Sequence, residues 1–485
     1  MTPRHLLLVV ADGIRPEVLA EEIDAGHAPA LAALRARGGL HAVSTVFPSV
    51  TGPAYVPFLM GRHPAPVGLP GLRWYDRARS LRWSPAQARS YAGVDIWHVD
   101  RDVHAEPPTL LELAQPSLAG MSMLARGATH GRVGRSLYWM LRAAPAHFRG
   151  DLAGWRTVEQ AATRAFFRRF ARARPRSAVL ALTIGDKRAH AEGPFGAGVR
   201  EAVADVDAAV ATARAIADRD GWGERLHVWV VADHGHAPVA HHDDLHGWLD
   251  GAGWRVLAHP RLSVRQPDLA LMVGGNAMAQ LYVDPATRTR GWWPALGGRG
   301  ARLLEALVQR PSVDLAMVAP DAHTVRVTHA GRGSAEVVRR GEGRAARWDY
   351  LVRDGDPLGL GGTLRGLSPC TAWEACAATD YPDSVVQLSL LASAPRTGDV
   401  ILSAREGWDL RSRFEPVAHV STHGALLRAQ MQVPLLVDVP VARAPQRTAD
   451  VAPSACTLLG VGAGVPFDGR CFLTPPGRDG GPAPE

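Results

Sequence analysis

Short apolar runs alternate with longer stretches of helical periodicity along much of the chain. Residues 199–217 repeat valine or alanine at every third or fourth position, which is typical of an amphipathic helix. Residues 157–174 form a second such stretch. The short runs are rich in leucine and β-branched residues and predict strands at 5–11, 41–47, 177–184, 226–232 and 433–439. This alternation predicts an α/β fold in which helices flank a mostly parallel central sheet.

Two long regions interrupt the alternation. Residues 64–150 are rich in proline, tryptophan and arginine and predict a cap-like insertion over one edge of the sheet. Residues 240–420 begin with a histidine-rich stretch, and the alternating runs within 314–353 predict a small antiparallel β-rich subdomain. We expect one domain over residues 1–474 that carries both insertions. Residues 475–485 are rich in proline and glycine and predict a flexible tail.

Composition narrows the class of protein. The 485 residues are 46% hydrophobic and 21% charged, which excludes a disordered or collagen-like chain. The net charge of +7 comes almost wholly from arginine, since Lys187 is the single lysine, and no basic–aromatic track suggests a nucleic-acid polymer as partner. Apolar runs are too short to span a bilayer, and Asp12 interrupts the first one, so neither a transmembrane segment nor a signal peptide is expected. Four cysteines without a CxxC pair favour a reducing compartment, so we expect a cytoplasmic location.

The predicted helix at 157–174 has an arginine-rich face. That face could lie on an anionic membrane surface as a peripheral contact. The favoured interpretation is an ordinary helix, in which Phe166, Phe167 and Phe170 pack on the sheet and the arginines face water.

Candidate metal ligands follow three of the predicted strands. Asp12 ends the first strand, Asp186 follows the third with His190 one helical turn later, and the fourth ends in Asp233 and His234. In open α/β sheets ligands bind at the carboxyl ends of the strands, so these side chains are expected to converge. Carboxylate and imidazole donors suit zinc, with manganese or iron as alternatives, and there are enough of them for two ions.

The second predicted strand leads into the segment Phe-Pro-Ser-Val-Thr-Gly-Pro. Its Thr51 is a candidate nucleophile, because a metal ion could lower the pKa of the hydroxyl beside a bound phosphate. The alternative is that Thr51 or Ser49 merely caps the following helix.

In their order along the chain, these motifs resemble the alkaline phosphatase superfamily. Besides Asp12 and the Thr51 segment, they include the D-x-x-x-H-x-x-G-P of residues 186–194, the Ala-Asp-His-Gly of 232–235, the Thr-His-Gly of 422–424 and a closing segment at 433–470. The likeness is greatest to the nucleotide pyrophosphatase/type I phosphodiesterase branch. The resemblance implies an alkaline phosphatase-like catalytic domain with a di-zinc site. One ion would be held by Asp186, His190 and His423, and the other by Asp12, Asp233 and His234.

The same resemblance implies that Thr51 attacks phosphorus and forms a phospho-enzyme or nucleotidyl-enzyme intermediate, which water then hydrolyses. His423 enters the site through the resemblance alone.

One departure from the branch bears on the substrate. Leu72 stands where an asparagine that binds a phosphoryl oxygen is expected. Arg73 is the nearest replacement, since a guanidinium binds phosphate oxygens well, and Lys187 could also reach a phosphate. The alternatives are that Arg73 lies on the surface of the insertion and that Lys187 points to solvent. A run of four further histidines, at 236, 241, 242 and 246, is interpreted as a hydrated flank of the site.

The sequence therefore predicts a metal-dependent hydrolase of small phosphoric esters, similar to phosphodiesterases and nucleotide pyrophosphatases. A sulfatase is disfavoured because the segment that begins at Thr51 lacks the Cys/Ser-x-Pro-x-Arg signature. A phosphomonoesterase of the same superfamily is one alternative. Another, from a different class, is a non-catalytic zinc-containing protein that binds anionic lipid.

Overall fold

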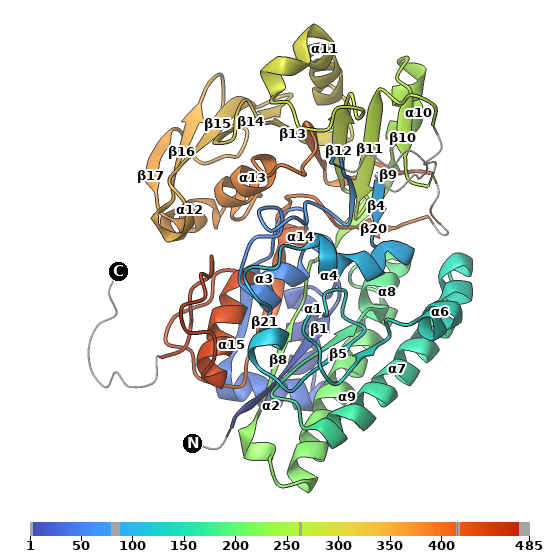
Figure 1. Ribbon diagram of the computed structural model, residues 1–485, viewed down its shortest axis with the longest axis vertical. Helices are drawn as coiled ribbons and strands as arrows, with labels where there is room; N and C mark the ends of the chain where they lie inside the picture. The colour runs from blue at the N-terminus through green and yellow to red at the C-terminus, as the bar shows by residue number, and fades with distance from the viewer. Residues whose placement is uncertain (1–2, 79–87, 261–263, 414, 416–417, 475–485) are drawn as a thin grey trace.

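The centre of the fold is a seven-stranded sheet covered by helices, with a second, larger sheet beside it (Figure 1). The structure is a computed structural model that describes residues 3–78, 88–260, 264–413, 415 and 418–474. The predicted tail at 475–485 lies outside these residues. In spatial order the central sheet consists of β2 (Leu40–Ser44), β21 (Gln432–Leu436), β8 (Leu226–Val231), β1 (His5–Ala11), β7 (Ser177–Leu182), β5 (Ser117–Gly120) and β6 (Arg132–Val133).

The central sheet is mostly parallel, as predicted. β1 pairs in parallel with β7 on one side and β8 on the other, and β5 is parallel to both β7 and β6. Toward the other edge, β21 is antiparallel to both of its neighbours, β8 and β2, so β2 runs in the same direction as β8. The second predicted strand ends three residues early, at Ser44, because the chain then turns away toward Thr51. The third ends at Leu182, since Ile184 already begins a helix.

Alternate residues of β1 face two separate cores. Leu7 and Val9 pack under the helices α1 (Pro16–Asp24), α2 (Pro29–Gly38), α7 (Leu152–Ala173) and α9 (Ala197–Arg219). Leu8 and Val10 point to the opposite face, beneath α3 (Tyr55–Met60), α5 (Leu110–Leu113) and α15 (Val451–Leu459). This period of two is what a strand buried on both faces requires. The other helices are α4 (Val99–Asp102), α6 (Leu137–Arg149), α8 (Ile184–Glu192), α10 (Leu245–Gly251), α11 (Gly297–Val308), α12 (Pro369–Cys376), α13 (Ser384–Ala392) and α14 (Arg428–Met431).

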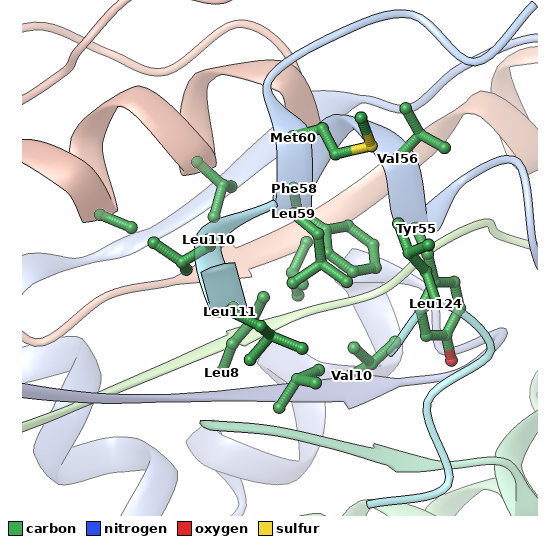
Figure 2. Close-up of a cluster of buried hydrophobic side chains, with 14 of the residues drawn as sticks. Leu8, Val10, Tyr55, Val56, Phe58, Leu59, Met60, Leu110, Leu111 and Leu124 are labelled. Atoms are coloured by element: carbon green, nitrogen blue, oxygen red, sulfur yellow. The ribbon is translucent and has the colours of Figure 1, made fainter. Parts of the chain in front are cut away.

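Helix α3 is held against β1 by large apolar side chains. Figure 2 shows Tyr55, Phe58 and Leu59 of α3 above Leu8 and Val10 of β1. All five side chains are buried. The turn that precedes α3 carries Thr51, and β1 leads into Asp12, so this contact sets the two segments beside each other.

The second sheet has nine strands and is larger than the 314–353 region predicts. It contains β13 to β16 from that region, but β11, β12 and β18 extend it on the side of the central sheet. In spatial order its strands are β10 (Val256–Ala258), β11 (Leu269–Gly274), β12 (Met278–Val283), β18 (Val400–Ala404), β13 (Val313–Val318), β14 (Thr324–His329), β15 (Gly333–Arg340), β16 (Arg347–Val352) and β17 (Leu364–Leu367). Small sheets join the two regions: β3 (Arg73–Tyr75) with β4 (Ala88–Ser90), and β9 (Ala237–His242) with β19 (Gly407–Asp409) and β20 (Ser421–Thr422).

The segment at 64–150 is only partly an insertion over the sheet. Its strands β5 and β6 extend the central sheet beyond β7. Two- and four-residue strands are too short to stand out in a sequence rich in proline and arginine, which is why the pattern did not reveal them.

The structure confirms that the phenylalanines of the 157–174 helix pack in the core, as the favoured interpretation predicts. Phe166, Phe167 and Phe170 of α7 are buried in the core beneath α9. Among the helices that the structure describes, none combines the length and the apolar character needed to cross a membrane.

A buried ion pair joins the two regions. The Arg447 guanidinium, just before α15, donates to both carboxylate oxygens of Asp383, just before α13, at 2.8 and 2.5 Å. Arg447 also donates to the carbonyl of Pro369 at 2.7 Å. Because both charged side chains are buried, removing one would leave the other without a compensating charge.

We therefore expect Arg447→Met to lower the free energy of unfolding by about 3–5 kcal/mol, measured by urea denaturation. The control is Arg35→Met, which removes an exposed pair with Asp24 and should cost less than about 1 kcal/mol. Equal losses in the two variants would contradict this account of the interface.

Candidate active site

Three carboxylates meet at one edge of the central sheet. Asp12 follows β1, Asp233 follows β8, and Asp186 lies in the first turn of α8 just after β7. The three strands are neighbours, with β1 in the middle, so their carboxyl ends bring these side chains together. Asp12 and Asp233 are buried, and the Asp186 side chain is 18% exposed. The convergence that the sequence predicted is therefore present.

Asp12, Asp233 and His234 form one group of donors. Atoms of the three side chains lie within 4.8 Å of one another, and His234 Nε2 stands 3.5 Å from Asp12 Oδ1. Within the described part of the chain, Asp12 Oδ1 and Asp233 Oδ2 are buried without a hydrogen-bond partner. Burial, together with the charges of Asp233 and Asp186, raises the pKa of Asp12 well above its usual range. Two buried carboxylate oxygens without donors fit a bound cation.

Asp186 stands at the centre of a second group, surrounded by imidazoles. Its Oδ1 lies 3.0 Å from Nε2 of His236, 3.3 Å from that of His190, 3.6 Å from that of His423 and 4.0 Å from that of His234. Donor atoms of Asp186, His234, His236 and His423 all lie within 4.8 Å of one another. Although burial opposes it, His190 and His236 hold the pKa of Asp186 well below its usual range.

The imidazoles are oriented by hydrogen bonds at Nδ1. In His190 and His423, Nδ1 lies 2.9 Å from the carbonyl oxygens of Ser421 and Ser49, so each Nδ1 must carry the proton that it donates. His236 Nδ1 lies 3.1 Å from the Ser421 hydroxyl, which itself donates to the carbonyl of Ala189, so Nδ1 is again the donor. In a neutral ring this leaves a lone pair on each Nε2, the atom that faces Asp186.

Lone pairs that face a carboxylate repel it unless a cation lies between them. Burial lowers the pKa of His236 to about 3 and that of His423 well below its usual range, so both rings are neutral at pH 7. A histidine that donates through one nitrogen to a carbonyl while the other faces a carboxylate is the arrangement found in metal sites. The donor set therefore fits a bound metal cation.

His423 reaches the site from far along the chain. It follows β20 and forms a bridge with Asn276, at the turn between β11 and β12. Its ring stacks on that of His234 with a centroid separation of 3.6 Å. The structure thus brings together all six residues that the sequence proposed as ligands, although His190 lies outside both 4.8 Å groups.

His236 was missed as a candidate ligand. It was interpreted as part of a hydrated flank, yet its side chain is fully buried and its Nε2 makes the shortest imidazole contact to Asp186. The space is kept open by Gly13, where a Cβ atom would lie 2.9 Å from His236 Nε2. The position of His236, two residues after His234 and just before β9, was the available signal. His242 bonds instead to Asp409, and His241 stacks on Trp408.

Thr51 faces the first donor group. Its Oγ1 lies 3.1 Å from His234 Nε2. Helix α3 begins only at Tyr55, and its N-cap residue, Ala54, makes no side-chain capping bond. Ser49 bonds to the backbone of Ala425 and Gly424. The alternative that Thr51 or Ser49 caps the helix is therefore wrong. The Thr51 hydroxyl points instead to His234, at the edge of the sheet where the candidate ligands lie.

Arg73 lies inside the molecule rather than on the surface of the insertion. Its guanidinium donates to the carbonyl of Val273 at 3.0 Å and to Ser90 Oγ at 3.3 Å. It lines a cavity with His259 and Arg411, and neither of these hydrogen bonds, the ones the described residues give its guanidinium, goes to a carboxylate. Burial, and then the charge of Arg411, lowers the pKa of Arg73 to about 9. An arginine without a carboxylate partner in such a place can receive an anion.

Lys187 points away from open solvent. Its Nζ lies 4.1 Å above the ring of Trp155 and 3.4 Å from His147 Nδ1. Burial lowers the pKa of Lys187, against the opposing charges of Asp186 and Asp12. The ammonium therefore borders the carboxylate cluster from the side of α6 and α7.

Solved structures of known proteins share the fold of this chain. Two solved structures share the fold: murine ectonucleotide pyrophosphatase/phosphodiesterase 5, and phosphonoacetate hydrolase from Sinorhizobium meliloti 1021. The first, an inactive variant with alanine in place of a threonine in complex with AMP, has 13% identity and a TM-score of 0.55 over 95% of this chain and 96% of that one. The second, in complex with phosphonoformate or phosphonoacetate, has 18% identity and a TM-score of 0.52 over 94% and 96%.

No curated protein matches the chain by sequence. Residues 6–426, however, match the family described as type I phosphodiesterase / nucleotide pyrophosphatase. This match confirms the predicted class of enzyme, a hydrolase of phosphoric ester bonds, and with it the predicted alkaline phosphatase-like fold. The chain belongs to the type I phosphodiesterase/nucleotide pyrophosphatase family.

Proposed function

We propose that the protein is a phosphodiesterase that uses Thr51 as its nucleophile beside two zinc ions. The observation that carries the proposal is the position of the Thr51 hydroxyl, 3.1 Å from His234 Nε2, at a cluster of carboxylates and imidazoles whose free lone pairs converge. A nucleophile next to such a donor set is what phosphoryl transfer through a covalent intermediate needs.

Two groups of residues would hold the ions. Asp12, Asp233 and His234 would hold one, and Asp186, His190 and His423 the other, with His236 as an additional ligand. When bound, the ions would lower the pKa of the Thr51 hydroxyl and balance the charge on the phosphoryl oxygens. Imidazole and carboxylate donors at this ratio favour zinc, and the site is also suited to manganese or iron.

The reaction proceeds in two displacements at phosphorus. Thr51 Oγ loses its proton and forms a bond to phosphorus, and the bond from phosphorus to the leaving-group oxygen breaks. A water molecule then attacks the same phosphorus, the bond to Thr51 Oγ breaks, and the hydroxyl is restored. Lys187 lies beside the carboxylate cluster, and Lys187 and Arg73 are the cations that would bind oxygen atoms of the substrate.

The substrate is a small phosphoric ester. The solved relative in complex with AMP supports a nucleotide-like product, and the relative in complex with phosphonoacetate supports recognition of a phosphorus oxyanion that carries a second anionic group. Arg73 and Arg411 line one cavity and suit such a second group. The cytoplasmic location stays a prediction.

We expect Thr51→Ala to abolish turnover while the bound metal and the thermal midpoint stay unchanged, because only the attacking hydroxyl is lost. The measurement is steady-state hydrolysis of bis-p-nitrophenyl phosphate, with metal content determined by mass spectrometry. Thr212→Ala, which removes a hydroxyl on the surface of α9, is the matched control. If Thr51→Ala kept wild-type activity, water rather than Thr51 would be the nucleophile.

His236→Ala should raise the dissociation constant of one of the two ions by about 10–100-fold or more, because a ligand or a directly attached orienting group is lost. Equilibrium dialysis against zinc measures this, and the visible absorption of the cobalt-substituted protein reports the change in coordination. Asp233→Ala should lose the other ion, and His41→Ala, at the far edge of the sheet, should lose neither. An unchanged cobalt spectrum in His236→Ala would remove His236 from the set of ligands.

Comparison of bis-p-nitrophenyl phosphate with p-nitrophenyl phosphate tests the class of substrate. We expect the diester to have the higher kcat/KM, because the chain belongs to a phosphodiesterase family. A preference for the monoester would instead favour the alternative that the protein is a phosphomonoesterase. The physical reason would then be that Arg73 replaces the expected asparagine.

A further inference from the structure

The positive charge of the chain is concentrated in one segment. Residues 113–185 hold twelve arginines and only two carboxylates, those of Asp151 and Glu159, so this segment alone is more positive than the +7 of the whole chain. Glu159 is buried, where it accepts hydrogen bonds from Thr183. The Asp151 carboxylate accepts a hydrogen bond from the Gly154 amide at the start of α7. The charge that the segment itself carries is therefore mostly positive, although Arg126, Arg132, Arg135 and Arg156 pair with Glu112, Asp100 and Asp205 outside it.

The same segment carries the main exposed apolar surface. Seven large hydrophobic side chains are exposed among the described residues, and four of them belong to α6: Leu137, Tyr138, Leu141 and Phe148, with exposed fractions of 61%, 56%, 65% and 74%. Positions 137, 141 and 148 are spaced by four and seven, so these side chains share one face of the helix. In Figure 1, α6 lies on the outer side of α7, away from the central sheet.

Arginines flank this apolar face. The Arg142 guanidinium donates to the Tyr138 hydroxyl at 2.6 Å and lies over the ring, 5.5 Å from its centroid. Arg149 is exposed at the end of α6, and Arg132 is 46% exposed just before it. Residues 132–150 contain no acidic residue. Leucine and aromatic side chains on one face, bordered by arginines, are typical of a helix that lies in the interface of an anionic membrane.

The α6 face lies one helix away from the candidate active site. His147, on the inner side of α6, contacts Lys187, and Lys187 is the neighbour of Asp186. Scattered single hydrophobic residues need no explanation on a protein surface, but four on one short helix beside a catalytic site do.

We propose that α6 docks the protein on the surface of an anionic phospholipid membrane, with Leu137, Leu141 and Phe148 inserted between lipids and Arg142 and Arg149 on the phosphate groups. The charge of residues 113–185 selects an anionic surface over a second copy of the chain, because two such surfaces repel each other. The proposal concerns binding and does not depend on the nucleophile or the metal ions.

The test is flotation of the full-length protein with vesicles of phosphatidylcholine alone and with vesicles that also contain phosphatidylserine, because anionic lipids attract basic protein surfaces. We expect binding to the anionic vesicles only. Arg142→Glu with Arg149→Glu should weaken it by roughly fivefold or more for each arginine, and Leu141→Asp with Phe148→Asp should abolish it. Arg302→Glu with Arg344→Glu, two exposed arginines elsewhere, should leave it unchanged.

Turnover of bis-p-nitrophenyl phosphate without vesicles reports folding, and all of these variants should retain it. Equal binding to neutral vesicles, or binding that survives both α6 variants, would overturn the proposal. Self-association that the α6 variants abolish, seen by sedimentation velocity without lipid, would replace the membrane with a second copy of the chain as the partner. If the wild-type protein showed no turnover, this result would count against the proposed function. The result of the vesicle experiment would still stand.

Discussion

The arrangement of the site follows from the cost of burying carboxylates. Asp12 and Asp233 are removed from water at the edge of the sheet, and Asp186 is close to them. A buried carboxylate without a compensating charge costs several kcal/mol, and two of the oxygens have no hydrogen-bond donor among the described residues. The neighbouring side chains do not remove this cost by ion pairs with arginine, as they do at Asp383. Imidazoles are present instead, and the neutral rings of His236 and His423 offer lone pairs to a cation rather than a charge of their own.

This constraint explains features far from the site. Gly13 is left without a side chain because a Cβ atom there would collide with His236 and with the backbone of Asp186. The turn between β11 and β12 belongs to the second sheet, yet it holds His423 above His234. The nine-stranded sheet thus supports one candidate ligand, His423, and the Arg447–Asp383 pair fixes the two regions to each other.

The central sheet and most of the site could be predicted because local sequence encodes them. A buried strand that ends in a carboxylate is visible in a single stretch, as with Asp12 and Asp233, and parallel neighbours bring such ends together. His423 could not be reached in this way, since its position depends on packing between two sheets. His236 was misinterpreted for the opposite reason: it stands in a run of histidines whose other members bond to Asp409 or stack on Trp408, and composition does not distinguish a buried ring from a hydrated one. The strands β5 and β6 were missed because they are short.

The basic segment at 113–185 and the cluster of carboxylates carry opposite charges. Phosphoric esters are anions, and a cluster of carboxylates repels them until cations are bound there. The arginines of residues 113–185 provide a positive potential outside the cluster, and Lys187 continues it to the side of Asp186. Arg126, Arg132, Arg135 and Arg156 form ion pairs with Glu112, Asp100 and Asp205. The charge of the exposed Arg142 and Arg149 acts on an approaching anion and on the surface that presents it. The exposed leucines and Phe148 on α6 add apolar surface, which charge alone does not supply. Burial of this surface in an apolar interface would hold the site next to that interface.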